Sequence, residues 1–233
     1  MLQSLLVSLL LVASFSSYSS EKLKNLDPKD FTITSVEISE LENDDQEITE
    51  NFVETKNVLS DIGKVIEIVD GLIALGEKIY PIVEAGKPVL ASNLPVTHVI
   101  PSIPDSAPDF TFSAMENWQA PRSRSYKVVY KNVYGVEVIS FTFAMNYQYG
   151  GSYDGAGKYL TGVFISAKNI HVSWGFEFSA ATEIISLTNR GTKENPVAGL
   201  TLQLSWTAKT ILSEIQSSKV IHVSGDGSIE SAL

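Results

Sequence analysis

A tyrosine- and glycine-rich segment, residues 149–159, is the part of the sequence whose residue types best suit a binding site. Three tyrosines stand there beside one acidic and one basic side chain, separated by glycines typical of a loop between strands. Such rings can stack on a sugar ring or contact a lipid headgroup, whereas the plainer alternative is a wide hairpin loop without a ligand. The predicted ligand-binding residues are Tyr149, Tyr153, Asp154, Lys158 and Tyr159.

The same segment does not match the phosphate-binding loops that its Gly157-Lys158 pair suggests. In such a loop Ser152 would have to be glycine, and Tyr159 would have to be the serine or threonine that holds the metal. A dinucleotide-binding glycine pattern also fails, because Leu160 stands where the third glycine belongs. The segment therefore gives no reason to expect a nucleotide cofactor.

Metal and thiol chemistry have little support in this sequence. The chain has no cysteine, which excludes disulfides, thiolate zinc sites, iron–sulfur clusters and cysteine nucleophiles. Its three histidines, His98, His171 and His222, show none of the spacings typical of zinc ligands. A Ser-His-Asp triad assembles in space and stays open, although no nucleophile-elbow motif supports one. We predict no metal site and no cofactor.

Paired carboxylates of the kind that hydrolyse glycosides are also weakly supported. Among the four acids considered for such a pair, only Glu177 lies near a tryptophan, Trp174, and alternation along a strand places these two side chains on opposite faces. We therefore predict that the protein is not an enzyme. The acids considered for such a pair are Glu137, Asp154, Glu177 and Glu183.

The first part of the chain has the pattern of an export signal. No charged residue precedes Glu21, and residues 5–15 form an apolar run of the length of a signal-peptide core. An uncleaved membrane anchor is the alternative, because residues 1–4 lack the usual lysine or arginine. We expect a secreted protein with residues 1–20 as its signal peptide.

Negative charge is concentrated in one short part of the chain. The net charge is −10, and residues 21–61, with 12 acidic and 4 basic side chains, contribute −8 of it. Non-specific nucleic-acid binding requires cations, so no nucleic-acid partner is expected. We predict a solvated acidic segment at residues 21–45, with loose association with Ca²⁺ or a mineral surface as the alternative.

Apolar residues at three- and four-residue steps predict a long helix after the acidic segment. We expect a helical segment over residues 46–84, either one helix that Pro81 ends or two that break near Gly71. Its wide apolar face must dock on the protein itself or contact a membrane or a partner. The apolar positions are Phe52, Leu59, Ile62, Ile66, Val69 and Ile73, with a second row at Val58, Val65, Leu72 and Ile79.

The rest of the sequence predicts strands. Six of the nine prolines fall within residues 85–121, which we interpret as a proline-rich connector. Over residues 122–224, apolar and polar residues alternate in several segments, as in an antiparallel β-sandwich or jelly roll. The polar positions are rich in Ser, Thr, Asn and Gln, which suits a binding face and equally suits strands that pair with other chains. Residues 225–233 are predicted to be a flexible tail.

The predicted fold class is therefore α+β, with a long N-terminal helix, single or broken, followed by an antiparallel β-sandwich or jelly-roll-like domain. The predicted function is that of a secreted, non-enzymatic binding protein whose sandwich recognises an extracellular glycan, lipid or protein surface. Two alternatives stay open. One is a membrane-active, pore-forming protein that inserts the apolar-faced helix, and the other is an acidic structural component of an extracellular matrix.

Overall fold

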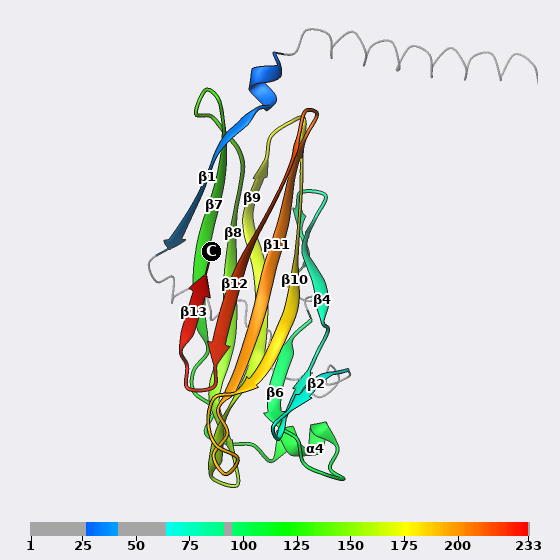
Figure 1. The fold of residues 1–233 in the computed structure, drawn as a ribbon, viewed down its shortest axis with the longest axis vertical. Helices are drawn as coiled ribbons and strands as arrows, with labels where there is room; N and C mark the ends of the chain where they lie inside the picture. The colour runs from blue at the N-terminus through cyan, green and yellow to red at the C-terminus, as the bar shows by residue number, and fades with distance from the viewer. Residues whose placement is uncertain (1–26, 42–63, 91–94, 233) are drawn as a thin grey trace, which may run out of the picture.

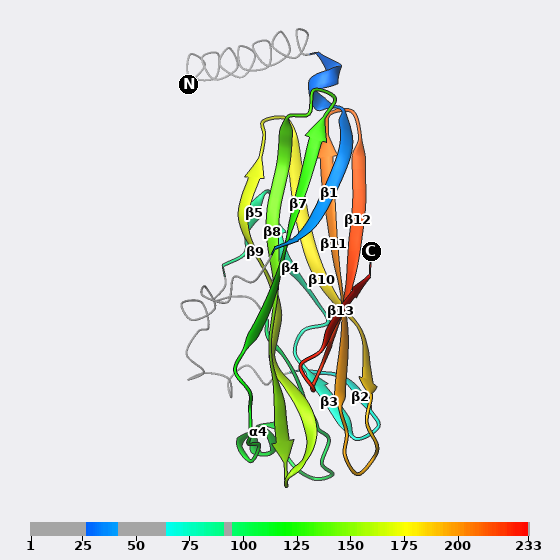
Figure 2. The same cartoon turned by 90° about the vertical axis from the view of Figure 1, so that its left-hand side faces the viewer.

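A computed structural model describes residues 27–41, 64–90 and 95–232 of the chain. These residues form two antiparallel β-sheets that pack face to face in an elongated molecule (Figures 1 and 2). The predicted β-sandwich is therefore confirmed.

Within the described residues, the first sheet has seven strands. Its centre is the long hairpin of β8 and β9, each of 17 residues, and every neighbouring pair of strands is antiparallel. In their order across the sheet, the strands are β1 (Ile33–Leu41), β7 (Arg122–Asn132), β8 (Glu137–Tyr153), β9 (Ala156–Val172), β6 (Thr97–Pro101), β3 (Leu72–Leu75) and β2 (Val65–Val69).

The second sheet has six strands in the described part of the chain, again all antiparallel. In their order across the sheet, the strands are β13 (Ile229–Ala232), β12 (Glu214–Ser224), β11 (Ala198–Thr210), β10 (Phe176–Asn189), β4 (Ile79–Glu84) and β5 (Lys87–Pro88).

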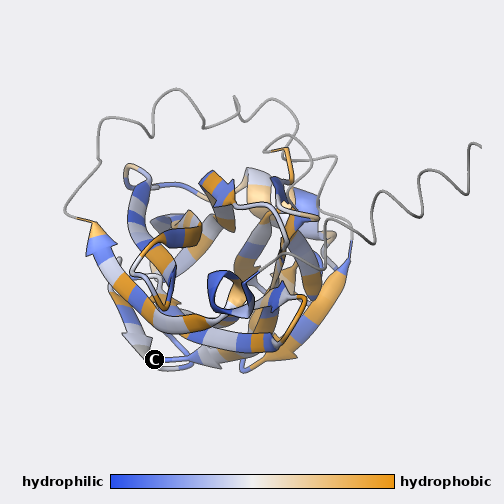
Figure 3. Cartoon of the chain, turned by 90° about the horizontal axis from the view of Figure 1, so that it is seen from above, coloured by the Kyte–Doolittle hydropathy of each residue, from blue (hydrophilic) through white to orange (hydrophobic). Residues whose placement is uncertain are grey.

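The core lies between the two sheets, and its centre is a layer of aromatic side chains. The ring of Phe141 on β8 lies 4.6 Å from that of Phe178 on β10, and Trp206 on β11 meets Phe141 edge-on at 5.7 Å. The indole Nε1 of Trp206 donates a hydrogen bond of 2.7 Å to the hydroxyl of Tyr130 on β7. Hydrophobic and hydrophilic residues alternate along the strands, as Figure 3 shows, and this alternation directs these rings inward.

The prediction of a long N-terminal helix is wrong. Residues 46–63 lie outside the described residues, and residues 65–84 carry three strands, β2, β3 and β4. The described helices are two short ones, η1 (Pro28–Phe31) and α4 (Pro108–Ser113). In the described residues the fold is therefore a β-sandwich rather than an α+β arrangement.

A two-residue turn explains why residues 65–75 form a hairpin. Asp70 and Gly71 both have positive φ, 46° and 80°, as in a type I′ turn, and Asp-Gly is among the strongest hairpin signals. The flanking strand β2 consists of Val and Ile apart from Glu67, and β-branched residues favour strands. In a run this rich in apolar residues, helical spacings occur whether the run forms a helix or a buried strand. All four residues of β3 are in fact buried.

Two other predicted segments contain regular structure. The connector predicted at residues 85–121 includes β5, β6 and α4, and β6 pairs with β3 and β9 inside the first sheet. The predicted flexible tail includes β13, which pairs with β12. Arg122 and Arg124 on β7 donate hydrogen bonds of 3.0 and 3.5 Å to the carbonyls of Gly227 and Ile229. The C-terminal strand is therefore attached to both sheets.

The substitution Gly71→Ala distinguishes a hairpin from a helix by the sign of its effect on stability. No atom lies within 4 Å of the position of an added Cβ, so the positive φ of Gly71 is the main cost to the hairpin. We expect a loss of about 1 kcal/mol in the free energy of unfolding, measured by urea denaturation. In a helix the same change would stabilise by about 1 kcal/mol.

Gly135→Ala is the matched control, since Gly135 also has a positive φ, 74°, and nothing within 4 Å of an added Cβ. Both variants should show a similar decrease in the free energy of unfolding. A gain in stability for Gly71→Ala alone would contradict the hairpin.

Candidate functional site

Three loops meet at one end of the sandwich, the upper end in Figures 1 and 2. The register of the strands places them there. The start of β8 pairs with the end of β9, with Ile139 opposite Val172. The start of β10 pairs with the end of β11, with Phe176 opposite Thr210. The β7–β8, β9–β10 and β11–β12 loops are therefore neighbours.

These loops expose large apolar side chains that are 40 to 68 % accessible to solvent. Loops are usually polar, because an apolar side chain that stays exposed to water contributes no burial energy to folding. A group of such residues on adjacent loops is instead typical of an interaction surface. We call this group the apolar tip; its members are Val133, Tyr134, Val136, Trp174, Ile211 and Leu212.

Polar side chains at the last strand residue before two of these loops determine the shape of the loops. The Asn132 side-chain oxygen accepts hydrogen bonds from the backbone N–H groups of Tyr134 and Val136 at 3.1 and 3.0 Å. The hydroxyl of Thr210 accepts from the N–H groups of Leu212 and Ser213, both at 3.0 Å. Asn and Thr commonly organise turns in this way. The apolar side chains of the tip are therefore presented on ordered loops.

The helix η1 supports the third loop. Phe31 is buried, and its ring stacks on Phe176 at 5.8 Å and meets Trp174 edge-on at 6.0 Å. Gly175 makes this close packing possible, because a Cβ there would lie 2.3 Å from the Phe31 ring. Trp174 is thus held against one aromatic ring while it stays 68 % exposed.

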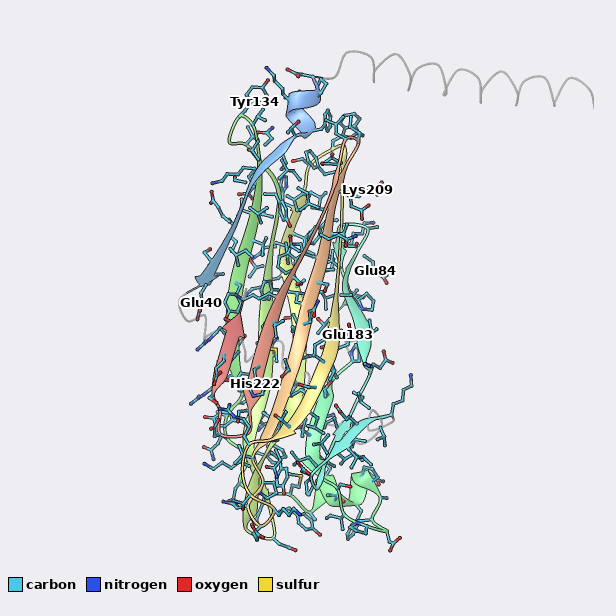
Figure 4. All side chains as sticks on the ribbon, in the orientation of Figure 1. Glu40, Glu84, Tyr134, Glu183, Lys209 and His222 are labelled. Atoms are coloured by element: carbon cyan, nitrogen blue, oxygen red, sulfur yellow. The ribbon has the colours of Figure 1, made fainter. Side chains whose placement is uncertain are left out.

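A hydrogen bond also connects η1 to the β7–β8 loop. The Tyr134 hydroxyl, at the upper end of the molecule in Figure 4, donates to Oδ2 of Asp27 at 3.1 Å. This bond raises the pKa of Tyr134. The pKa of the Asp27 carboxyl is lowered, first by the backbone N–H of Lys29 and then by the Tyr134 hydroxyl. Both shifts favour the pair of a neutral phenol and a carboxylate.

Charged residues directly behind the tip form pairs of opposite sign. Lys131 Nζ lies 2.7 Å from Oε1 of Glu37, and Lys209 Nζ lies 3.5 Å from Oε2 of Glu177. These two described lysines are therefore each balanced by a glutamate.

A groove of about 870 Å³ lies beside the tip, between the β9–β10 loop and the β4–β5 turn. One part of its lining is aromatic, from Trp174 and Phe176. The other part is polar and charged, and it comes from Lys87, His171, Ser173, Glu177 and Lys209.

The residues predicted to bind a ligand lie at the opposite end, around the β8–β9 hairpin. Tyr159 is in the core, 3 % exposed, and Tyr149 is partly buried under the Arg122 guanidinium, whose carbon lies 4.5 Å from the ring centroid. Tyr153 packs partly buried against the core, while Asp154 and Lys158 are exposed. The structure therefore does not bring the three rings together on one exposed surface.

A polar face of the predicted composition is present on the second sheet. It lines a shallow groove of about 660 Å³ with small uncharged side chains. Its role in binding stays a prediction. The groove-lining Ser, Thr and Gln residues are Ser179, Gln203, Ser205, Thr207, Gln216, Ser217 and Ser218.

The three histidines lie apart, and each contacts a hydroxyl group. His98 lies 2.7 Å from the Thr161 hydroxyl, His171 lies 3.2 Å from that of Ser173, and His222 lies 2.9 Å from that of Thr201. Within residues 27–41, 64–90 and 95–232, no group of three or more His, Asp or Glu side chains is placed to hold a metal ion. The same residues include no helix that is long and apolar enough to cross a membrane.

No protein-family model, curated protein or solved structure matches this chain. The function must therefore be inferred from the geometry of the chain itself. The apolar tip was not identified from the sequence, although one indication was available. Residues 133–136 and residues 211–212 place large apolar side chains between strands, where polar residues are the norm.

The two ends of the sandwich should respond differently to loss of a tyrosine. Tyr159→Ala removes a buried ring and should lower the free energy of unfolding by about 3 kcal/mol. Tyr134→Ala removes an exposed ring at the tip and should cost about 0.5 kcal/mol or less. Urea denaturation of the two variants measures both values, and equal losses would contradict the burial described above.

Proposed function

We propose that this protein is an exported, non-enzymatic protein that binds the surface of a lipid bilayer through the apolar tip. The observation that carries the proposal is the gathering of six large exposed apolar side chains on three neighbouring loops at the end of an elongated fold. Such an end can enter a membrane surface without any change in the sandwich behind it.

The composition of the tip favours a bilayer over an apolar protein partner. Tyr134 and Trp174 are the residue types that concentrate at the boundary between headgroups and acyl chains. Ile211 and Leu212 can reach deeper, into the acyl region, because they carry no polar atoms on their side chains. Three separate loops also suit a fluid surface, which adapts to each of them independently.

The free energy gained by burying the aliphatic side chains of the tip in a bilayer is sufficient for reversible membrane binding. A fully buried aliphatic side chain gains about 1.5–3 kcal/mol on transfer from water. Ile211 and Leu212 are 56 and 53 % exposed, so each has roughly half of its surface left to bury. The two together should contribute about 2 kcal/mol, which corresponds to about a 30-fold change in the partition constant.

The charge pairs behind the tip determine how membrane binding is expected to depend on lipid charge and on salt concentration. Lys131 and Lys209 each lie beside a glutamate, so the positive charge of these two described lysines is largely balanced and should contribute little to the attraction of anionic lipid. Binding should therefore occur on neutral phosphatidylcholine vesicles. It should also change little with ionic strength, because it depends on apolar burial.

The double variant Ile211→Ser/Leu212→Ser tests the proposal. We expect it to bind dioleoylphosphatidylcholine vesicles about 30-fold more weakly than the wild type in a sedimentation assay, since it loses the apolar surface that the bilayer would cover.

The matched control is Ile68→Ser/Phe110→Ser, which replaces two side chains that are 60 and 65 % exposed on β2 and α4, at the other end of the molecule. This control should bind vesicles like the wild type. Equal losses in both double variants, or a wild type that binds no vesicles, would refute the membrane-binding role of the tip.

A further inference from the structure

We propose that the groove beside Trp174 binds a phosphocholine headgroup, that is, a quaternary ammonium linked to a phosphate. This inference rests on the proposed membrane contact, because a groove beside an embedded tip lies at the level of the headgroups. Trp174 belongs to both the tip and the groove, so it connects the two surfaces.

The aromatic part of the groove suits the quaternary ammonium. Such a cation is too bulky and too poorly hydrated to favour a simple ion pair, and it binds best over the face of an aromatic ring, tryptophan above all. Trp174 is supported edge-on by Phe31, and Phe176 lines the groove beside it. Glu177 lines the same groove and supplies the negative charge that a cation requires.

The opposite charge is also present in the groove. Lys209 on β11 and Lys87 on β5 both line it and supply positive charge for a phosphate. Figure 4 labels Lys209 a short way below Tyr134, on the side of the molecule that carries β4. The groove thus offers a carboxylate and two ammonium groups to a ligand that carries one positive and one negative charge.

The ion pair between Glu177 and Lys209 does not block such a ligand. Their atoms are 3.5 Å apart and their side chains are 76 and 54 % exposed, so the pair is a weak surface interaction. A zwitterion can place its ammonium beside Glu177 and its phosphate beside Lys209. Both side chains then keep a partner of opposite charge. A purely anionic headgroup that pairs with Lys209 would instead leave the Glu177 carboxylate without a cation, which disfavours such a ligand.

Titration of the full-length protein with soluble phosphocholine, followed by calorimetry, tests the groove without a membrane. We expect Glu177→Gln and Trp174→Ala each to weaken binding about fivefold, because each removes one contact to the ammonium group. Glu183→Gln is the matched control. It makes the same change on the same strand, β10, outside the groove, and should bind phosphocholine like the wild type.

The tip variant Ile211→Ser/Leu212→Ser separates this inference from the proposed function. It should bind soluble phosphocholine like the wild type while it loses vesicle binding. A wild type that binds phosphatidylcholine vesicles but not phosphocholine would overturn the headgroup site and leave the membrane contact intact. Binding of phosphocholine without any vesicle binding would overturn the membrane contact and leave the headgroup site intact.

Inorganic phosphate and dioleoylphosphatidylglycerol vesicles are the remaining probes. The headgroup site predicts that both bind more weakly than phosphocholine and phosphatidylcholine vesicles, respectively. Equal binding of inorganic phosphate and phosphocholine would show that only the lysines act, and it would overturn the role of Trp174 and Glu177.

Discussion

Packing of one sheet on the other through aromatic side chains is the constraint on which the rest of the structure depends. The chain has no cysteine, so no disulfide can hold the sheets together, and the core must supply the stability. Phe141, Phe178 and Trp206 fill the space between the sheets. The single N–H of the Trp206 indole is satisfied by the Tyr130 hydroxyl of the facing sheet, at 2.7 Å. This bond gives the two layers a preferred alignment as well as a packed interior.

The alignment of the sheets determines which loops are neighbours. The β7–β8 loop belongs to the first sheet, the β11–β12 loop belongs to the second, and the β9–β10 loop crosses between them. The apolar tip therefore exists only while both sheets are correctly packed. None of its six side chains is needed for the core, since all are at least 40 % exposed. Their apolar character is therefore better explained by an external contact than by folding, which is why we assign the tip to a membrane surface.

Local alternation was sufficient to identify the strands of the sandwich. The apolar positions that alternate with polar ones from Ile139 to Tyr147 and from Leu200 to Trp206 are buried in the core. The same kind of reasoning failed for residues 65–84, because a nearly continuous apolar run satisfies helical and strand spacings alike. The Asp70-Gly71 turn was the feature that distinguished them. The predicted binding segment, residues 149–159, is not a wide loop, because only Asp154 and Gly155 lie between the strands and its other residues belong to β8 and β9. Its composition also did not reveal that Tyr159 faces the core.

The face on which each strand residue lies follows from the amino-acid order, because successive side chains point in opposite directions along an extended chain. The absence of disulfides and the concentration of negative charge follow from the sequence in the same direct way. The apolar tip and the groove beside it depend instead on pairings between distant residues, such as Ile33 with Asn132 and Phe176 with Thr210. Strand order and register are set by the packing of the whole sandwich, and no local pattern records them. The end of the molecule that the loops of Trp174 and of Ile211 and Leu212 share therefore becomes apparent only once the two sheets are assembled.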